Sequence, residues 1–119
     1  MLRRFALAAA PARADITLRV AGASESRKLN GKYRARKHAT NVLSFPYGGG
    51  SGDVVLCHPV IAREAREQGK SLRAHYAHLV VHGVLHLRGH DHLRKREAGR
   101  MERAELRILR RLGFEDPYQ

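Results

Sequence analysis

The sequence predicts a small single domain that combines helices with a few short strands. At 119 residues the chain has room for one modest hydrophobic core. Two kinds of apolar spacing occur along it, the two-residue period of strands and the three- to four-residue period of helices. Glycine and proline separate many of these segments, as they do at the ends of helices and strands. We therefore expect residues 1–119 to form one domain.

The first part of the chain is expected to form a helix, a strand and a second helix. Residues 2–10 have helical spacing, and Pro11 should stop this helix because proline cannot continue its hydrogen bonds. Residues 16–20 alternate apolar and polar side chains, which is typical of a strand with one buried face. Ser24 is a candidate N-terminal cap for the second helix.

Two strands are expected in the middle of the chain. Residues 42–45 form the first, which Pro46 should close. Residues 48–52 are glycines and one serine, and they predict a flexible turn that is too short to link two domains. Residues 53–57 are almost continuously apolar, so this strand should be the central one.

Three helices are expected in the second half. Pro59 suits the first turn of a helix that runs to Gln68 and ends at Gly69. The next helix, about residues 72–87, has apolar residues all around its axis and should be largely buried. The last helix, about residues 94–112, has one apolar stripe. Its other faces are expected to hold its charges, including the glutamates Glu97, Glu102 and Glu105.

Three histidines at the end of the buried helix have the spacing of a metal site. His82 and His86 are four residues apart, so they lie one above the other on one helix face. Two imidazoles placed in this way can bind one metal ion. Gly89 can end the helix in a left-handed conformation, and the returning chain can bring in His92 as a third ligand. Three nitrogens leave a fourth position open, as in catalytic zinc sites.

A less specific interpretation of these histidines exists. One histidine on an apolar helix face is usually a buried packing residue, and two can arise by chance in a chain that holds eight. Three at this spacing, with a glycine at the turn, favour metal binding. His75 and His78 lie on nearly the same side of the helix. We expect them to pack against or support the ligands rather than to bind the ion.

The histidine spacing is that of the metzincin proteases, but one residue of their motif is absent. In those enzymes the first histidine is followed by a glutamate that acts as general base. Gly83 stands at that position here. A zinc ion can polarise a peptide carbonyl or a phosphoryl oxygen. The missing base counts against the peptide as substrate.

The charge of the chain favours a nucleic-acid partner. Its formal net charge is +12, and such an excess attracts polyanions. Residues 27–37 hold basic side chains and no acidic one, which fits either a solvated helix face or a phosphate-contacting edge. Cys57 is the only cysteine, which excludes an internal disulfide and fits a reducing compartment. No apolar run is long enough to span a bilayer, so we expect a cytoplasmic protein without a membrane partner.

Segments on both sides of the histidines carry a resemblance to a known family. They are Leu29-Asn30 with Tyr33-Arg34, Thr40–Pro46, Gly52–Val55, Glu64–Lys70 and Glu115–Tyr118. Together with residues 82–92, and in this order, they resemble the YbeY family of bacterial ribosomal-RNA maturation factors and single-strand endoribonucleases. The resemblance covers nearly the whole chain from Leu2 onward.

The resemblance implies a fold, a metal site and a role. The implied fold class is α+β, a small mixed β-sheet packed with helices, with the metal bound in an open cleft on a metzincin-like zinc-binding helix. His82, His86 and His92 would bind one Zn²⁺ ion per chain. Arg34 would match the family's functionally important arginine, a fixed positive charge suited to a phosphate. We expect Arg34 and His86 to be the catalytic residues.

The implied activity is that of a metal-dependent endoribonuclease specific for single strands. It would act in maturation of the 3′ end of small-subunit ribosomal RNA and in ribosome quality control. Its partners would be ribosomal RNA, the small ribosomal subunit and assembly factors.

Some positions depart from the family pattern. Lys37 and Ala39 replace its usual aspartate and proline, and His90 stands where a tyrosine is common. His90 could compete for the metal, but the spacing favours His92. The chain also begins without the family's usual first strand, so its N-terminus is expected to be shorter.

Two other functions remain open at this point. The protein could be a non-catalytic RNA-binding assembly factor with a structural zinc ion, or a metalloprotease with its base elsewhere in the chain. No residue of the histidine motif is an obvious general base. Asp91 could orient a ligand imidazole, and the 2′-hydroxyl of the RNA could be the nucleophile.

Overall fold

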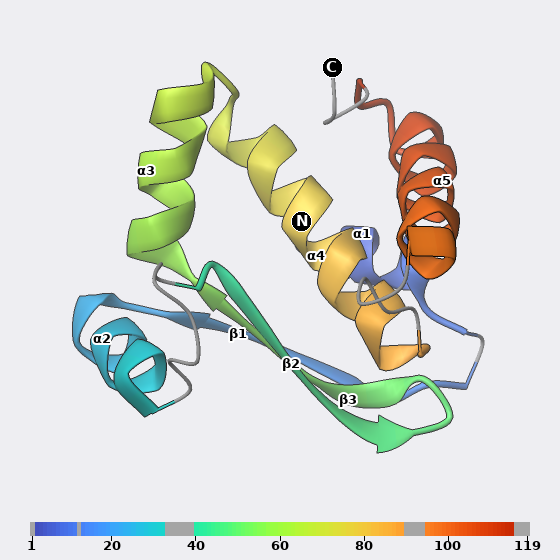
Figure 1. The fold of residues 1–119 in the computed structure, drawn as a ribbon, viewed down its shortest axis with the longest axis horizontal. Helices are drawn as coiled ribbons and strands as arrows, with labels where there is room; N and C mark the ends of the chain where they lie inside the picture. The colour runs from blue at the N-terminus through green and yellow to red at the C-terminus, as the bar shows by residue number, and fades with distance from the viewer. Residues whose placement is uncertain (1, 12, 33–39, 90–94, 116–119) are drawn as a thin grey trace.

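The computed structural model describes residues 2–11, 13–32, 40–89 and 95–115 (Figure 1). Within these residues, three strands and five helices occur in mixed order. In chain order the elements are α1 (Leu2–Ala9), β1 (Ile16–Ala21), α2 (Ala23–Lys32), β2 (Val42–Gly48), β3 (Ser51–Cys57), α3 (His58–Gln68), α4 (Leu72–Leu87) and α5 (Lys95–Arg111). The expected α+β class is confirmed.

The three strands form one mixed sheet with β3 in the middle. The order is β1-β3-β2, in which β1 runs parallel and β2 antiparallel to β3. The central position predicted for residues 53–57 is therefore confirmed. The prediction that Pro46 closes its strand is wrong, because β2 continues to Gly48. Within the described residues β2 pairs only with β3, and an edge strand tolerates a proline because one side of it needs no ladder hydrogen bonds.

The glycine-rich segment between β2 and β3 is a tight hairpin turn. Its two central residues, Gly49 and Gly50, have φ values of +62° and +84°. Positive φ at both positions is the requirement of a type I′ turn, whose twist matches that of the paired strands. The predicted turn thus joins two paired antiparallel strands directly.

Helix α4 lies at the centre of the layer of helices that covers one face of the sheet. Figure 1 shows α1, α3, α4 and α5 on this face, and α2 beside the end of the sheet. Helix α4 contacts α1, α3 and α5 as well as β2 and β3. The largest fully buried apolar side chains come from several of these elements: Phe5, Leu56, Ile61, Leu85, Met101 and Leu109. None of the helices in the described ranges combines the length and the hydropathy needed to cross a bilayer.

The ends of α4 follow the sequence closely. The helix spans Leu72–Leu87, as predicted, and the hydroxyl of Ser71 accepts a hydrogen bond from the amide of Ala74. Gly89, one residue beyond the C-terminal cap, has φ of +91°, the left-handed conformation expected of it. The prediction for Ser24 is wrong, because α2 begins at Ala23 and places Ser24 inside its first turn.

Gly83 allows α4 to lie directly on the sheet. A Cβ atom at this position would lie 2.8 Å from Cγ1 of Val54 and 3.2 Å from Cγ2 of Val42. The hydroxyl of Ser44 donates a hydrogen bond to the carbonyl oxygen of Gly83 over 2.9 Å. The absence of a side chain at residue 83 therefore sets how closely the histidine helix approaches β2 and β3.

Candidate metal centre

His82 and His86 hold two ring nitrogens at a separation that suits a shared metal ion. Their Nε2 atoms are 3.2 Å apart, and both side chains are partly buried. For metal–nitrogen distances of about 2.0–2.1 Å, two ligands of a tetrahedral ion are about 3.3–3.4 Å apart. The donor pair predicted from the i, i+4 spacing is therefore brought together by the helix, and its chemistry fits a metal ion.

The opposite ring nitrogen of His82 faces a buried carboxylate. Oε1 of Glu105, on α5, is 2.5 Å from Nδ1 of His82, and Oε2 is 3.1 Å from Nε2 of His78. The side chain of Glu105 is fully buried. A carboxylate removed from water needs such partners, because an unpaired buried charge is strongly unfavourable.

These contacts create a second group of donor atoms around His82. Donor atoms of His78, His82 and Glu105 all lie within 4.8 Å of one another, and such a group could hold a metal ion. His82 belongs both to this group and to the pair with His86, through its two different ring nitrogens. The described residues therefore offer a possible metal site on either side of one imidazole.

His75 forms a separate histidine–carboxylate pair on α4. Its Nε2 atom is 3.0 Å from Oε1 of Glu64, which also accepts a hydrogen bond from the side-chain amide of Asn41. His75 as a whole residue is only 3% exposed. Burial lowers the pKa of His75, and the neighbouring Glu64 opposes this shift. His75 is thus a buried residue that is neutral at pH 7.

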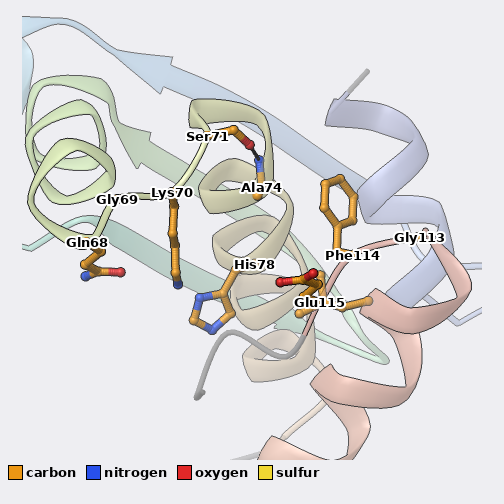
Figure 2. A pocket seen from close by; sticks show the side chains of 10 residues that line it. Gln68, Gly69, Lys70, Ser71, Ala74, His78, Gly113, Phe114 and Glu115 are labelled. Atoms are coloured by element: carbon orange, nitrogen blue, oxygen red, sulfur yellow. Dashed lines mark hydrogen bonds between the residues drawn. The ribbon is translucent and has the colours of Figure 1, made fainter.

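A cavity of about 410 Å³ is lined in part by His78, which lies one helical turn before His82 on α4. It is found where the α3–α4 turn meets the end of α5, and Figure 2 shows Lys70, His78 and Glu115 around it. Its other lining residues are Gln68, Gly69, Ser71, Ala74, Leu109, Gly113 and Phe114. His78 thus lies between this cavity and Glu105, whereas His82 and His86 are not among the lining residues.

Several predicted site residues lie outside the described part of the chain. They are the expected third ligand His92, the expected catalytic residue Arg34, and the neighbours His90 and Asp91. Their roles stay predictions. Of the predicted site residues, the structure places His82 and His86, which it brings together.

Comparison with protein families identifies the family of the chain. The family model described as "Endoribonuclease YbeY" matches residues 3–113. The chain belongs to the YbeY family. Its relatives include proteins named Endoribonuclease YbeY from Aromatoleum aromaticum and Bordetella petrii, which are 53% and 54% identical to it. The matches cover 99% and 90% of this chain, and 79% and 72% of the respective relatives.

A solved structure shares the fold of this YbeY family member. The solution structure of a Thermotoga maritima protein superposes with a TM-score of 0.59 at 21% sequence identity. The superposition covers 99% of this chain and 86% of the other. At this identity the likeness extends to the fold alone, and it supports the arrangement of helices and sheet described above.

Glu105 is the residue that the sequence prediction misplaced in this YbeY chain. It was expected on an outer face of the last helix, but it is fully buried against the histidines of α4. The signal that could have located it is its spacing. Glu105 lies four residues after Met101 and four before Leu109, both of which belong to the buried stripe. A carboxylate on such a stripe, next to a histidine-rich helix, indicates a buried ion pair.

Proposed function

We propose that this protein is a metal-dependent endoribonuclease that cleaves single-stranded RNA during ribosomal-RNA maturation. Membership of the YbeY family supports the activity, since the family model and the two relatives above are named endoribonucleases. The net charge of +12 supports an RNA substrate. The structural observation that carries the proposal is the 3.2 Å separation between the Nε2 atoms of His82 and His86.

We assign one Zn²⁺ ion per chain to His82, His86 and His92. Two considerations favour the Nε2 side of His82 over the side of Glu105. The 3.2 Å spacing to His86 fits a tetrahedral ligand pair, whereas the 2.5 Å contact to Glu105 is too short for one and fits a hydrogen bond. When bound, zinc would polarise a phosphoryl oxygen and lower the pKa of water. His82 and His86 would contribute neutral nitrogens fixed on a buried helix.

Arg34 is the residue that we assign to the phosphate. Its guanidinium keeps its positive charge at any physiological pH and can donate two parallel hydrogen bonds to phosphate oxygens. It would stabilise the negative charge that builds up on the phosphate during cleavage. No residue of the histidine motif is an obvious general base, and the 2′-hydroxyl of the RNA could serve as the nucleophile. That route leaves cyclic phosphate ends.

The expected biological setting follows from the family. We place the action at the 3′ end of small-subunit ribosomal RNA and in ribosome quality control, in the cytoplasm. The expected partners are ribosomal RNA, the small ribosomal subunit and its assembly factors. The net charge of +12 would provide the attraction to ribosomal RNA.

A protease is disfavoured by the packing around Gly83. The position that holds the general base in H-E-x-x-H enzymes faces the sheet here, with Val54 and Val42 within 3.2 Å of an added Cβ atom. A glutamate could not fit there without moving the helix. The family comparison points in the same direction.

Substitution of His86 tests the proposal against a non-catalytic RNA-binding factor. The His86→Ala variant should lose cleavage of a single-stranded ribosomal-RNA fragment and keep its RNA affinity. The matched control is His58→Ala, which removes an exposed histidine at the start of α3 and should cleave normally. Wild-type protein that binds the RNA without cleaving it would support the binding factor. Peptide turnover without RNA cleavage would support the protease. Analysis of the product ends tests the 2′-hydroxyl route.

A further inference from the structure

The geometry points to Glu105 as a positioning residue that prepares His82 to bind the metal. This inference rests on the proposed function, because it concerns the same metal site. It adds a residue from a different helix, α5, to the three histidines. It also assigns a purpose to a fully buried carboxylate, which is a costly feature in a domain of this size.

The first step of the argument concerns where the protons are. An ionised carboxylate has only acceptor atoms, so a hydrogen bond to Glu105 must be donated by the partner. His82 therefore donates from Nδ1 to Oε1 over 2.5 Å, and His78 donates from Nε2 to Oε2 over 3.1 Å. With its proton on Nδ1, a neutral His82 has its lone pair on Nε2. This is the nitrogen that lies 3.2 Å from Nε2 of His86.

The second step concerns orientation. His82 sits on α4 and Glu105 on α5, and these two helices pack against each other in the core. Glu105 is fully buried, and so are Met101, Ala104 and Ile108, the residues near it on the same helix. A carboxylate held in this way limits the rotation of the His82 ring. A ring that is already fixed loses less conformational entropy when it binds the metal, so binding is more favourable.

The third step concerns affinity. A hydrogen bond from a ligand imidazole to a carboxylate makes the opposite nitrogen more basic, and the loss of such a partner typically lowers metal affinity about 10–100-fold. His78 holds the second oxygen of Glu105 and lines the cavity in Figure 2. Its role in this arrangement is to keep the carboxylate in place. We assign it no contact with the metal.

The test is the zinc affinity of the Glu105→Gln variant, measured on the full chain by competition with a chelator of known affinity. Glutamine keeps the size of the side chain and removes its charge, so affinity should fall about 10–100-fold. The control is Glu64→Gln. It removes the charge of the carboxylate on α3 that pairs with His75, and His75 lies on the same helix as His82. His75 lies seven residues before His82, and this control should bind zinc within about twofold of wild type.

A second readout does not depend on zinc or on a folded variant. In metal-free wild-type protein, two-bond ¹H–¹⁵N correlation spectra of histidine rings show which nitrogen carries the proton. We expect the neutral form of His82 to be protonated at Nδ1. Protonation at Nε2 instead would overturn the inference, even if Glu105→Gln failed to fold. In a folded Glu105→Gln variant the preference for Nδ1 should weaken.

The outcomes separate this inference from the proposed function. Wild-type protein that binds no zinc would contradict the proposed function. Wild-type protein that binds zinc, with Glu105→Gln binding it equally well, would contradict the role of Glu105 alone. If His78→Gln lost zinc binding completely, and lost more than Glu105→Gln, the positioning role of Glu105 would be overturned. His78 would then be a direct ligand in the group with His82 and Glu105.

Discussion

Ser44 and Gly83 join the sheet to the middle of the histidine helix, with the serine hydroxyl donating to the glycine carbonyl over 2.9 Å. The contact is possible because residue 83 has no side chain. An added Cβ atom would lie 2.8 Å from Val54 and 3.3 Å from the hydroxyl oxygen of Ser44. Gly83, directly after His82, thus allows close packing. This packing fixes the distance between the helix that carries His82 and His86 and the sheet.

Gly83→Ala should destabilise the protein. Alanine favours a helix over glycine by about 0.8–1.0 kcal/mol, but overpacking a core typically costs about 1–3 kcal/mol. Val54 is itself fully buried, so it cannot move away easily. We expect the free energy of unfolding to fall by about 1–2 kcal/mol, which is measurable by urea denaturation.

Gly99→Ala provides the matched control within α5. The nearest atom to an added Cβ there is the end of the Arg103 side chain, at 3.3 Å. This flexible side chain can move, so the helix preference of alanine should dominate and stabilise the protein by about 0.5–1 kcal/mol. Equal effects of the two substitutions would contradict the close packing described at Gly83.

The sequence was sufficient to predict most of the fold, because its local signals agree with the tertiary structure. Gly69 and Gly89 have the left-handed conformations expected at helix ends, and the predicted bounds of α4 are confirmed. Strand β3 is central, as its apolar run indicates. The prediction for Pro46 is wrong because proline ends a strand only where its missing N–H would have to donate a ladder hydrogen bond. Strand β2 lies at the edge of the sheet, and this position depends on the tertiary structure rather than on the local sequence.

The site was predictable only where it depends on one helix. The i, i+4 spacing of His82 and His86 fixes their separation from local geometry alone. Glu105 reaches His82 through the packing of α5 on α4, which no local pattern specifies. The stripe that contains Met101 and Leu109 indicates which side of α5 is buried, but a glutamate is usually expected on the other side.

Metal-free protein should lose stability as the pH falls below about 6.5, in part because of His75. Burial lowers the pKa of His75 in the folded chain, Lys70 and His78 act in the same direction, and Glu64 opposes them. The unfolded chain therefore takes up a proton first as the pH falls. The contribution of neutral His75 to stability is complete above the pKa that His75 has in the unfolded chain. It is lost as the pH falls from that value through the lower pKa of His75 in the folded chain.

Urea denaturation of wild type and His75→Gln between about pH 7.5 and pH 5.5 measures this contribution. The variant should lose less stability over this interval than wild type. All other histidines are present in both proteins, so the difference reports the effect of His75. Equal losses would show that burial of His75 does not affect its protonation.

Arg34→Ala should slow RNA cleavage about 10²–10³-fold, the usual effect of removing one group that stabilises transition-state charge. Its zinc content should stay at the wild-type level, because the residue is not a ligand. The control is Arg27→Ala, which removes an exposed arginine from α2. Unchanged cleavage by Arg34→Ala would remove this residue from the catalytic site.

The exposed arginines of α5 should contribute to RNA binding. Replacing Arg103 and Arg107 by alanine should weaken binding to single-stranded RNA. It should also reduce the log–log slope of affinity against salt concentration by about 0.7 for each phosphate that is no longer neutralised. The control removes Arg3 and Arg4, two exposed charges of α1, and keeps the net charge of the two variants equal. Equal weakening in both would mean that net charge, rather than the face of α5, determines binding.

The most direct measurement combines metal analysis with a ribonuclease assay on the same sample of the protein. We expect about one zinc ion per chain, cleavage of single-stranded RNA, loss of both after chelation, and recovery of both when zinc is added back. Cleavage that continues at its full rate after the zinc has been removed would contradict a catalytic metal held by His82 and His86.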